Sequence, residues 1–135
     1  MASLKQFTRR IFQRAEAIEK QASKGLRETA LVVDRAVVLA TPVDIGRARG
    51  NWIVGVNTRK ESAVRTTDRG GGATIAAGES EIGKAEAGDT IHITNNLPYI
   101  VPLNNGSSIQ ASAGFAQRAI QQGANHARAF RLLDG

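Results

Sequence analysis

Few side chains in this sequence could do chemistry, and they are not grouped along the chain. Neither His92 nor His126 is followed by a second metal ligand three or four residues later, the usual spacing of a metal-binding pair. Three serines have neither a G-x-S-x-G motif nor a nearby histidine: Ser107, Ser108 and Ser112. The chain has no cysteine, which excludes disulfides, cysteine metal sites and thiol nucleophiles.

The carboxylates and glycines do not suggest a reaction either. Glu79, Glu81 and Glu86 crowd one charged segment, which is typical of a solvated surface. The three glycines after Arg69 lack the Lys-Ser/Thr pair of a phosphate-binding loop, and no G-x-G-x-x-G spacing occurs. We therefore expect no enzyme activity, no metal and no cofactor.

Composition limits the class of protein but not its partner. A length of 135 residues is typical of one domain, and the net charge of +6 with a pI near 10.5 favours an acidic partner. Many arginines alternate with acids, as in RRIFQRAEAIEK, so a solvated helix face is an alternative explanation. No run is long and apolar enough for a signal peptide or membrane span, so we expect a chain that stays in the cytoplasm of the cell that makes it.

The elements that would position these residues begin with a helix over residues 4–40. Apolar and small side chains recur there at steps of three and four, with Ser3 as a candidate N-cap and Pro42 as the stop. One helix of this length would span about 55 Å, more than a small domain needs. Either it breaks near Ser23 to Gly25, or its first half projects and packs on another subunit.

The next region predicts a strand and a loop. VDIGRARGNW allows a short helical turn at residues 46–49, and NWIVGVN alternates as a strand does. Trp52, the one tryptophan, is expected to anchor the core or an interface under the first helix. Residues 58–72 are polar and end in three glycines, so we expect a long mobile loop.

The remaining chain predicts a short helix, a strand, a turn and a last helix. TIHIT at 90–94 is a strand that should pair with residues 51–57. A last amphipathic helix should begin after Ser112, a candidate N-cap. The predicted fold is α+β in one domain, 1–135: a long N-terminal helix over 1–41, a small antiparallel sheet with loop and turns over 42–111, and a C-terminal helix over 112–135.

Several blocks of the sequence match a known pattern. TPVDIGRARGNW at 41–52 resembles the T-P-V-D-T-G-R-x-R-x-x-W segment of the HK97 gp10-like family of phage tail and neck proteins. GGATIAAG, AGDTIHITNNLPYIVPLNNGSS and QASAGF resemble that family's glycine-rich segment, its strand and turn, and the start of its last helix. The chain departs from the family at Asn104 and Asn105, where a glutamate and often an aromatic stand, and at Ser112, where proline is common.

The resemblance implies a virion structural protein at the head-tail interface: a neck, tail-completion or tail-terminator subunit. Its partners would be other copies of itself in a ring, phage neck or connector proteins and tail tube proteins, with passing contact with genomic DNA and no membrane. It would be made in the host bacterial cytoplasm and end in the virion, at the head-tail junction or tail. A ring needs two unlike, complementary faces on each subunit.

Two sets of residues are candidates for structural or interface roles. We hypothesise that Asp44 pairs with Arg47 or Arg49 and fixes the turn before Trp52; the alternative is an ordinary aspartate at a helix start. The other set presents an apolar surface to the core or to a partner: Pro98, Tyr99, Leu103 and Phe115.

A second class of function also fits the charge. The chain would then be a basic, phage-encoded nucleic-acid-binding protein or a non-virion assembly protein. The basic residues expected to face DNA or a partner are Arg59, Arg65 and Arg69. DNA affinity would fall steeply with salt, because phosphate contacts release counterions.

Overall fold

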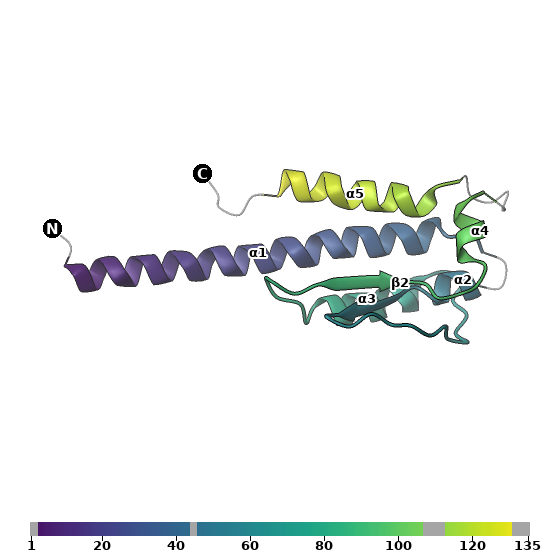
Figure 1. Cartoon of the computed structure of the whole chain (residues 1–135), viewed down its shortest axis with the longest axis horizontal. Coiled ribbons are helices and arrows are strands. Elements are labelled where there is room, and N and C mark those ends of the chain that lie inside the picture. The colour runs from purple at the N-terminus through teal and green to yellow at the C-terminus, as the bar shows by residue number, and fades with distance from the viewer. Residues whose placement is uncertain (1–2, 44–45, 107–112, 131–135) are drawn as a thin grey trace.

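The computed structural model describes residues 3–43, 46–106 and 113–130. One long helix, α1 (Leu4–Ala40), runs through the molecule (Figure 1). Helix α5 (Phe115–Ala129) lies along one side of its C-terminal half, and a two-stranded sheet with helix α3 (Gly72–Ile82) lies along the other side. The predicted α+β fold is therefore confirmed.

Helix α1 begins and ends where its sequence predicts. The Ser3 hydroxyl accepts a hydrogen bond from the Gln6 backbone, and the Gln6 side chain accepts one from the Ser3 backbone, which together form a capping box. Thr41 is extended, because the following Pro42 disfavours helical geometry. The helix is continuous through Ser23 and Gly25, so the predicted break is wrong and the first half projects from the rest of the molecule (Figure 1).

The sheet consists of β1 (Ile53–Val56) and β2 (Ile91–Thr94), paired antiparallel as predicted. Ile53 lies opposite Thr94, and Val56 lies opposite Ile91. Asn57 follows β1 in the left-handed region, with φ of 59°, and its side chain bonds Asp89 and the backbone of Thr90. These bonds close the end of the two-stranded ribbon.

The C-terminal half of α1 is the centre of the core. On one side Val37 and Val38 pack with Phe115 and Ala119, and the rim of this cluster includes Trp52. A second cluster joins α1 to β1 and the end of α3, through Ala30, Val54 and Ile82. The first half of α1 takes no part in either cluster.

Two short helices and the last helix differ in detail from the sequence pattern. Helix α2 (Arg47–Gly50) lies where a helical turn was predicted, while the segment after Pro98 forms a short helix, α4 (Ile100–Asn104). Helix α5 begins at Phe115 with Gly114 at its N-cap, so the helix starts later than predicted. The N-cap predicted at Ser112 is wrong for this helix, and Ser112 itself lies outside the described residues.

The long loop between β1 and α3 is held to the body by hydrogen bonds along its length. The Lys60 carbonyl accepts hydrogen bonds from the side chains of Thr94 and Asn96. The Val64 backbone donates to Asn51, and Asp68 accepts from the first turn of α3. Within the parts of the chain that are described, no helix combines the length and apolar character needed to cross a membrane.

Candidate assembly surfaces

The first half of α1, Leu4–Lys20, extends beyond the packed part of the molecule, and we call it the projecting half. All seventeen of its residues are exposed, and at 1.5 Å per residue it extends about 25 Å. It carries four large apolar side chains, Leu4, Phe7, Ile11 and Phe12, that are between 53% and 81% exposed. A group of exposed apolar side chains on one element commonly marks an interaction site.

Most of these side chains belong to one straight stripe along the helix. Leu4, Phe7, Ile11, Ala15, Ile18 and Ala22 follow steps of three, four, four, three and four residues. These five steps cover 18 residues, an average of 3.6 per step, which is the α-helical repeat, so the stripe does not wind around a nearly straight helix. It therefore continues onto the face of α1 that α5 covers.

The covered part of that face shows close helix packing. The ring of Phe130 lies over Gly25, where an added Cβ would be 2.6 Å from its Cε1 atom. Further along, Gly123 of α5 lies against the Val33 side chain, with no room for a Cβ. Glycines on both helices thus allow α5 to approach α1 closely, while the same face of the projecting half has no partner among the described residues.

The projecting half is also basic. Lys5, Arg9, Arg10 and Arg14 are exposed, and the first acid of the chain is Glu16. No acidic residue stands in the first turn, where it would favour the positive end of the helix dipole. The tip of the molecule is therefore a positively charged, amphipathic helix.

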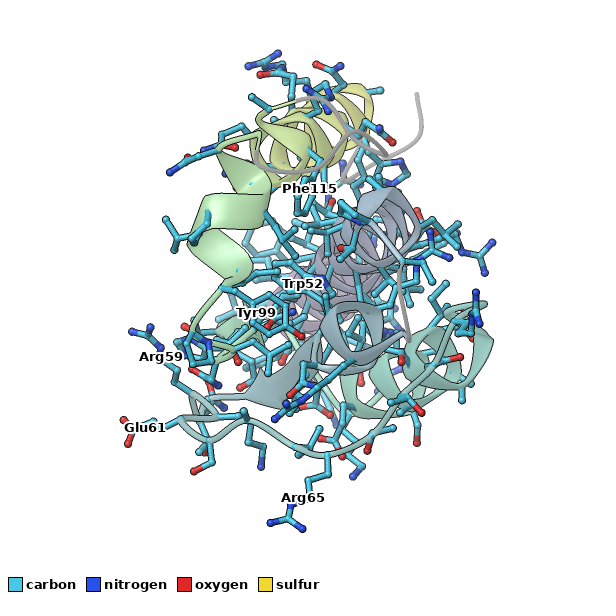
Figure 2. The ribbon with its side chains drawn as sticks, turned by 90° about the vertical axis from the view of Figure 1, so that its right-hand side faces the viewer. Trp52, Arg59, Glu61, Arg65, Tyr99 and Phe115 are labelled. Carbon is cyan, nitrogen blue, oxygen red and sulfur yellow. The ribbon has the colours of Figure 1, made fainter. Side chains whose placement is uncertain are left out.

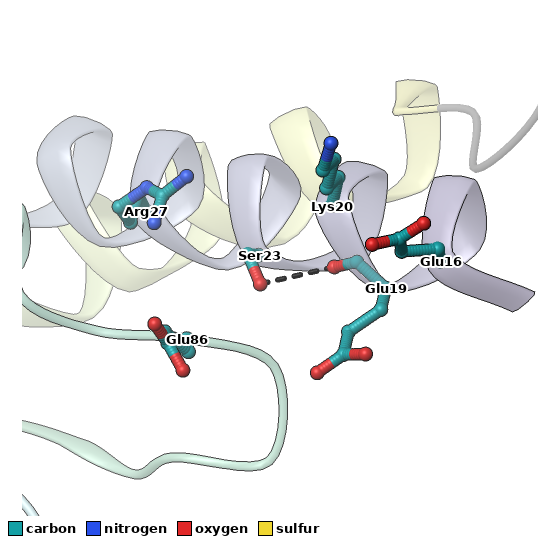
Figure 3. A pocket seen from close by; sticks show the side chains of 6 residues that line it. All are labelled: Glu16, Glu19, Lys20, Ser23, Arg27 and Glu86. Atoms are coloured by element: carbon teal, nitrogen blue, oxygen red, sulfur yellow. Dashed lines mark hydrogen bonds between the residues drawn. The ribbon is translucent and has the colours of Figure 1, made fainter. Parts of the chain in front are cut away.

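A charged notch lies where the projecting half leaves the body (Figure 3). It has a volume of about 360 Å³ and is lined by Glu16, Glu19, Lys20, Ser23, Arg27 and Glu86. The Ser23 hydroxyl donates to the Glu19 carbonyl and accepts from the Ala87 backbone, and Arg27 donates to the Ala85 carbonyl. The three carboxylates form no hydrogen bond within the described part of the chain, so they face solvent.

Arg49 and Trp52 fix the C-terminal end of α1. The Arg49 guanidinium donates to the carbonyls of Thr41, Leu39 and Arg69, at 3.2, 2.9 and 2.8 Å. The Trp52 indole donates to the Thr41 hydroxyl at 2.8 Å. A cation that bonds the last carbonyls of a helix also suits the negative end of its dipole. Both side chains therefore hold the C-terminal end of α1 in place through hydrogen bonds within the chain.

The proposed pairing of Asp44 with Arg47 or Arg49 is not tested, since Asp44 lies outside the described residues. Arg47 is exposed on α2, and its backbone carbonyl accepts from the Asn51 side chain. The Arg49 guanidinium already donates to the carbonyls of Leu39, Thr41 and Arg69. The turn before Trp52 is thus held by Arg49 and Asn51, whatever the role of Asp44.

The candidate apolar residues divide between core and surface (Figure 2). Phe115, the first residue of α5, is 1% exposed, and Leu103 of α4 packs against the same core cluster. Pro98 is exposed, and Tyr99 keeps 40% of its surface accessible beside α4. Pro98 and Tyr99 therefore remain candidates for contact with a partner, and Phe115 is a core residue.

The candidate basic residues do not converge on one site. Arg59 and Arg65 are exposed on the long loop and point in different directions, with Glu61 between them in the sequence (Figure 2). Arg69 is also exposed, and its carbonyl is the one that Arg49 binds. The projecting half holds a denser group of positive charge than this loop does, a feature that the sequence reasoning did not select.

One carboxyl is buried without a hydrogen-bond donor. Asp34 of α1 is 1% exposed and faces Gly78 of α3, and neither of its carboxyl oxygens has a hydrogen-bond partner among the described residues. Burial first, and then the nearby charge of Glu79, raise the pKa of Asp34 from 3.8 to about 7. Sequence reasoning missed this residue, because its burial depends on Gly78 of α3, which lies 44 residues further along the chain.

The other perturbed acids are surface caps. Hydrogen bonds from Thr74 lower the pKa of Asp68 and place it at the start of α3. The Asn57 side chain lowers the pKa of Asp89. His126 lies 3.3 Å from Glu28, and within the described ranges no three potential ligands gather around a metal site.

The arrangement therefore offers contact surfaces rather than a set of reacting groups. Its most unusual surface is the projecting half of α1, with its stripe and its positive charge. The chain was compared with protein-family models, curated proteins and solved structures, and none of them matches it.

Proposed function

We propose that this chain is a bacteriophage structural protein of the head-tail interface, a neck, tail-completion or tail-terminator subunit that assembles into a ring. Two independent features support the proposal. The first is the resemblance of the blocks between residues 41 and 130 to the phage tail and neck family. The second, which carries the mechanical argument, is the projecting half of α1, with large apolar side chains that no other described element covers.

Contact with a neighbouring subunit would remove these side chains from water. Burying a Leu, Ile or Phe side chain contributes about 1.5–3 kcal/mol, so the four side chains supply roughly 6–12 kcal/mol before the costs of association. An element that leaves its own body is also suited to a heterologous contact, in which each copy offers one surface and receives another. Repetition of such a contact by rotation closes a ring. The function would then be mechanical: each ring docks on its neighbours in the neck or tail.

The test is immunogold electron microscopy of purified phage particles from the source, with antibody against this chain and with partly disrupted necks. We expect label at the head-tail junction. A matched antibody against a host cytoplasmic protein controls for trapped lysate. Clean particles without label, together with antigen detected in the lysate, would overturn the virion assignment.

A second candidate is a basic nucleic-acid-binding or non-virion assembly protein. One specific observation favours it: the projecting half carries Lys5, Arg9, Arg10 and Arg14 without an acid before Glu16. Neutralising the three arginines to glutamine should then abolish DNA binding that weakens steeply with salt. The matched control neutralises Arg59, Arg65 and Arg69. Loss of DNA binding with normal incorporation into particles would separate the two functions.

A further inference from the structure

The body of the molecule carries an apolar groove that begins where the stripe of the projecting half ends. One cavity of about 320 Å³ is lined by the α1 residues Ala22 to Thr29 and by the end of α5 at Ala127 and Phe130. A second, of about 350 Å³, is lined by α1, by Ile91 and Ile93 of β2 and by Ile120 of α5. Both cavities are lined by Leu26 and Thr29, so they adjoin along α1, and the two together are called the groove.

The groove is open and chemically uniform. Among the lining residues that are described, none is charged and Thr29 is the only polar one. Ile120 on its rim is 60% exposed, although the next residue on one side, Ala119, is buried against α1. Apolar grooves of this form accept amphipathic helices through side chains spaced three and four residues apart.

We propose that this groove receives the projecting half of α1 from a second copy of the same chain. Each molecule then has a convex apolar helix at one end and a concave apolar groove on its body. The inference rests on the proposed function in one respect, because it takes the partner to be another copy. It goes further by naming the receiving surface and the direction of the helix within it.

Length supports the match. Along α1 the groove runs from Ala22 to Val33, about 17 Å, and along α5 from Ile120 to Phe130, about 15 Å. The segment from Phe7 to Ile18 has the same length, about 17 Å. The stripe side chains Phe7, Ile11 and Ile18 therefore fit within the length of the groove.

Charge sets the direction. The basic residues Lys5, Arg9 and Arg10 lie at the start of the incoming helix, and the notch carboxylates of Glu16, Glu19 and Glu86 lie near the Ala22 end of the groove. A helix parallel to the receiving α1 brings the basic tip to these carboxylates. Lys20 and Arg27 also line the notch, but Arg27 is engaged by the Ala85 carbonyl. An antiparallel helix would instead bring Glu16 and Glu19 of one copy close to those of the other, which is unfavourable.

The parallel direction also determines the type of assembly. The incoming copy's body lies beyond the C-terminal end of the receiving α1, so its own groove stays free for a third copy. Such a contact is heterologous, and its repetition builds a ring when the rotation between neighbouring copies closes. The antiparallel direction would make two copies exchange their helices and stop at a closed dimer.

Cysteine cross-linking tests the proposal directly, because the natural chain contains no cysteine. Four variants each carry one cysteine: Phe7→Cys and Ile18→Cys on the helix, Ala127→Cys and Ile120→Cys on the groove. Because Phe130 lies at Gly25 and Gly123 lies at Val33, Ala127 is close to the Ala22 end and Ile120 to the other end. Purified full-length variants are mixed in pairs and joined with a short bifunctional maleimide.

The parallel contact predicts cross-linked dimers for Phe7→Cys with Ala127→Cys and for Ile18→Cys with Ile120→Cys, at a yield several-fold above the control. The control partner is Ser80→Cys, exposed on α3. Dominant products from the crossed pairs would show helix exchange in a closed dimer. A Phe7→Cys product formed without any partner variant would show stripe-to-stripe pairing, and yields no higher than the control would show no self-contact. Each of these three results overturns the proposal.

A charge exchange provides a second readout. Arg9→Glu with Arg10→Glu in the Phe7→Cys variant should reduce the yield several-fold, and Glu16→Arg with Glu19→Arg in the Ala127→Cys variant should restore it. Restoration would not occur if the charges acted only on the stability of α1. These measurements need no phage particle. Absence of label from virions would therefore contradict the proposed function, whereas absence of cross-links would contradict the proposed contact between copies.

Discussion

The two halves of α1 carry the same apolar pattern but have different surroundings. Around Val37 and Val38 the helix is covered by α5 on one side and by the sheet on the other. Around Phe7 and Ile11 the corresponding side chains face solvent. The periodicity of a helix thus identifies the face that will be covered, but it does not identify the element that covers it.

This difference in surroundings also separates the residues that stabilise the fold from those available for assembly. Contacts in the C-terminal half determine the stability of the body, whereas the projecting half contributes to stability only after a partner binds it. Substitutions in the two halves should therefore give different results in a purified, unassembled chain.

Phe115→Ala should cost the most stability. Phe115 is 1% exposed in the cluster between α1 and α5, and removal of such a ring leaves a cavity that costs about 3–5 kcal/mol. Chemical denaturation, at a protein concentration where the chain is monomeric, measures the free energy of unfolding. The matched Phe12→Ala change, at a side chain that is 70% exposed, should stay within about 0.5 kcal/mol. Similar losses in the two variants would mean that the projecting half belongs to the folded body.

Asp34→Asn should raise stability at neutral and higher pH. Because burial raises the pKa of Asp34 above its unfolded value of 3.8 to about 7, the folded state favours the protonated form. The contribution of Asp34 to the free energy of unfolding of the wild type should be highest below pH 4. It should fall by roughly 4 kcal/mol between pH 4 and 7 and then stay constant. Urea denaturation across this pH range measures the effect.

The variant should lose that pH dependence, while the ion pair of the neighbouring Glu79 with Arg35 stays in place. Asp68 serves as a control, because its contribution to stability changes with pH in the opposite direction. Thr74 lowers the pKa of Asp68, so its contribution is present above the unfolded pKa and disappears as pH falls through the folded pKa. A wild-type chain whose stability is unchanged between pH 4 and 7 would rule out the assigned environment of Asp34.

Gly123→Ala should loosen the packing of α5 on α1. The added methyl group meets the Val33 side chain, and overpacking of this kind costs about 1–3 kcal/mol. Thermal denaturation followed by circular dichroism measures the loss. Gly72→Ala, at the first residue of α3 with no atom within 4 Å of the new Cβ, should be neutral or slightly stabilising. Equal behaviour of the two variants would argue against close contact between α1 and α5.

Ser3→Ala should have the smallest effect on the body. Loss of the capping hydroxyl costs the helix about 1 kcal/mol, but only at the tip. Hydrogen exchange should become faster in the first turns of α1, with no change around Val37. The midpoint of global unfolding should stay the same; a clear decrease would show that the tip and the body unfold together.

The sequence alone predicts the elements whose causes are local. Ser3, Pro42 and the apolar stripe predict both ends of α1, and the alternation of TIHIT predicts β2 and its pairing. The predicted break near Gly25 failed for a reason that is not local: this glycine leaves room for the ring of Phe130. Length and composition could not reveal that contact, because it joins residues more than a hundred positions apart.

The site residues divide in the same way, into those predictable from local sequence and those that depend on distant contacts. The projecting half was expected as one of two alternatives, because its pattern is local. The Arg49 contacts could not be predicted, since they collect carbonyls from Leu39, Thr41 and Arg69 on separate segments. Burial of Asp34 depends on the approach of Gly78 from α3, and no spacing within α1 indicates it.

The capping box at Ser3 has a consequence for the speed of docking. A seventeen-residue peptide in water would be a marginal helix, because its first turn is costly to form. Here the nucleus lies in the anchored half of α1, and the capping box satisfies donors at the far end. The docking helix is thus preorganised before it meets a partner, and little chain entropy is lost on binding. Association of such an arm should be limited by collision and orientation rather than by coupled folding.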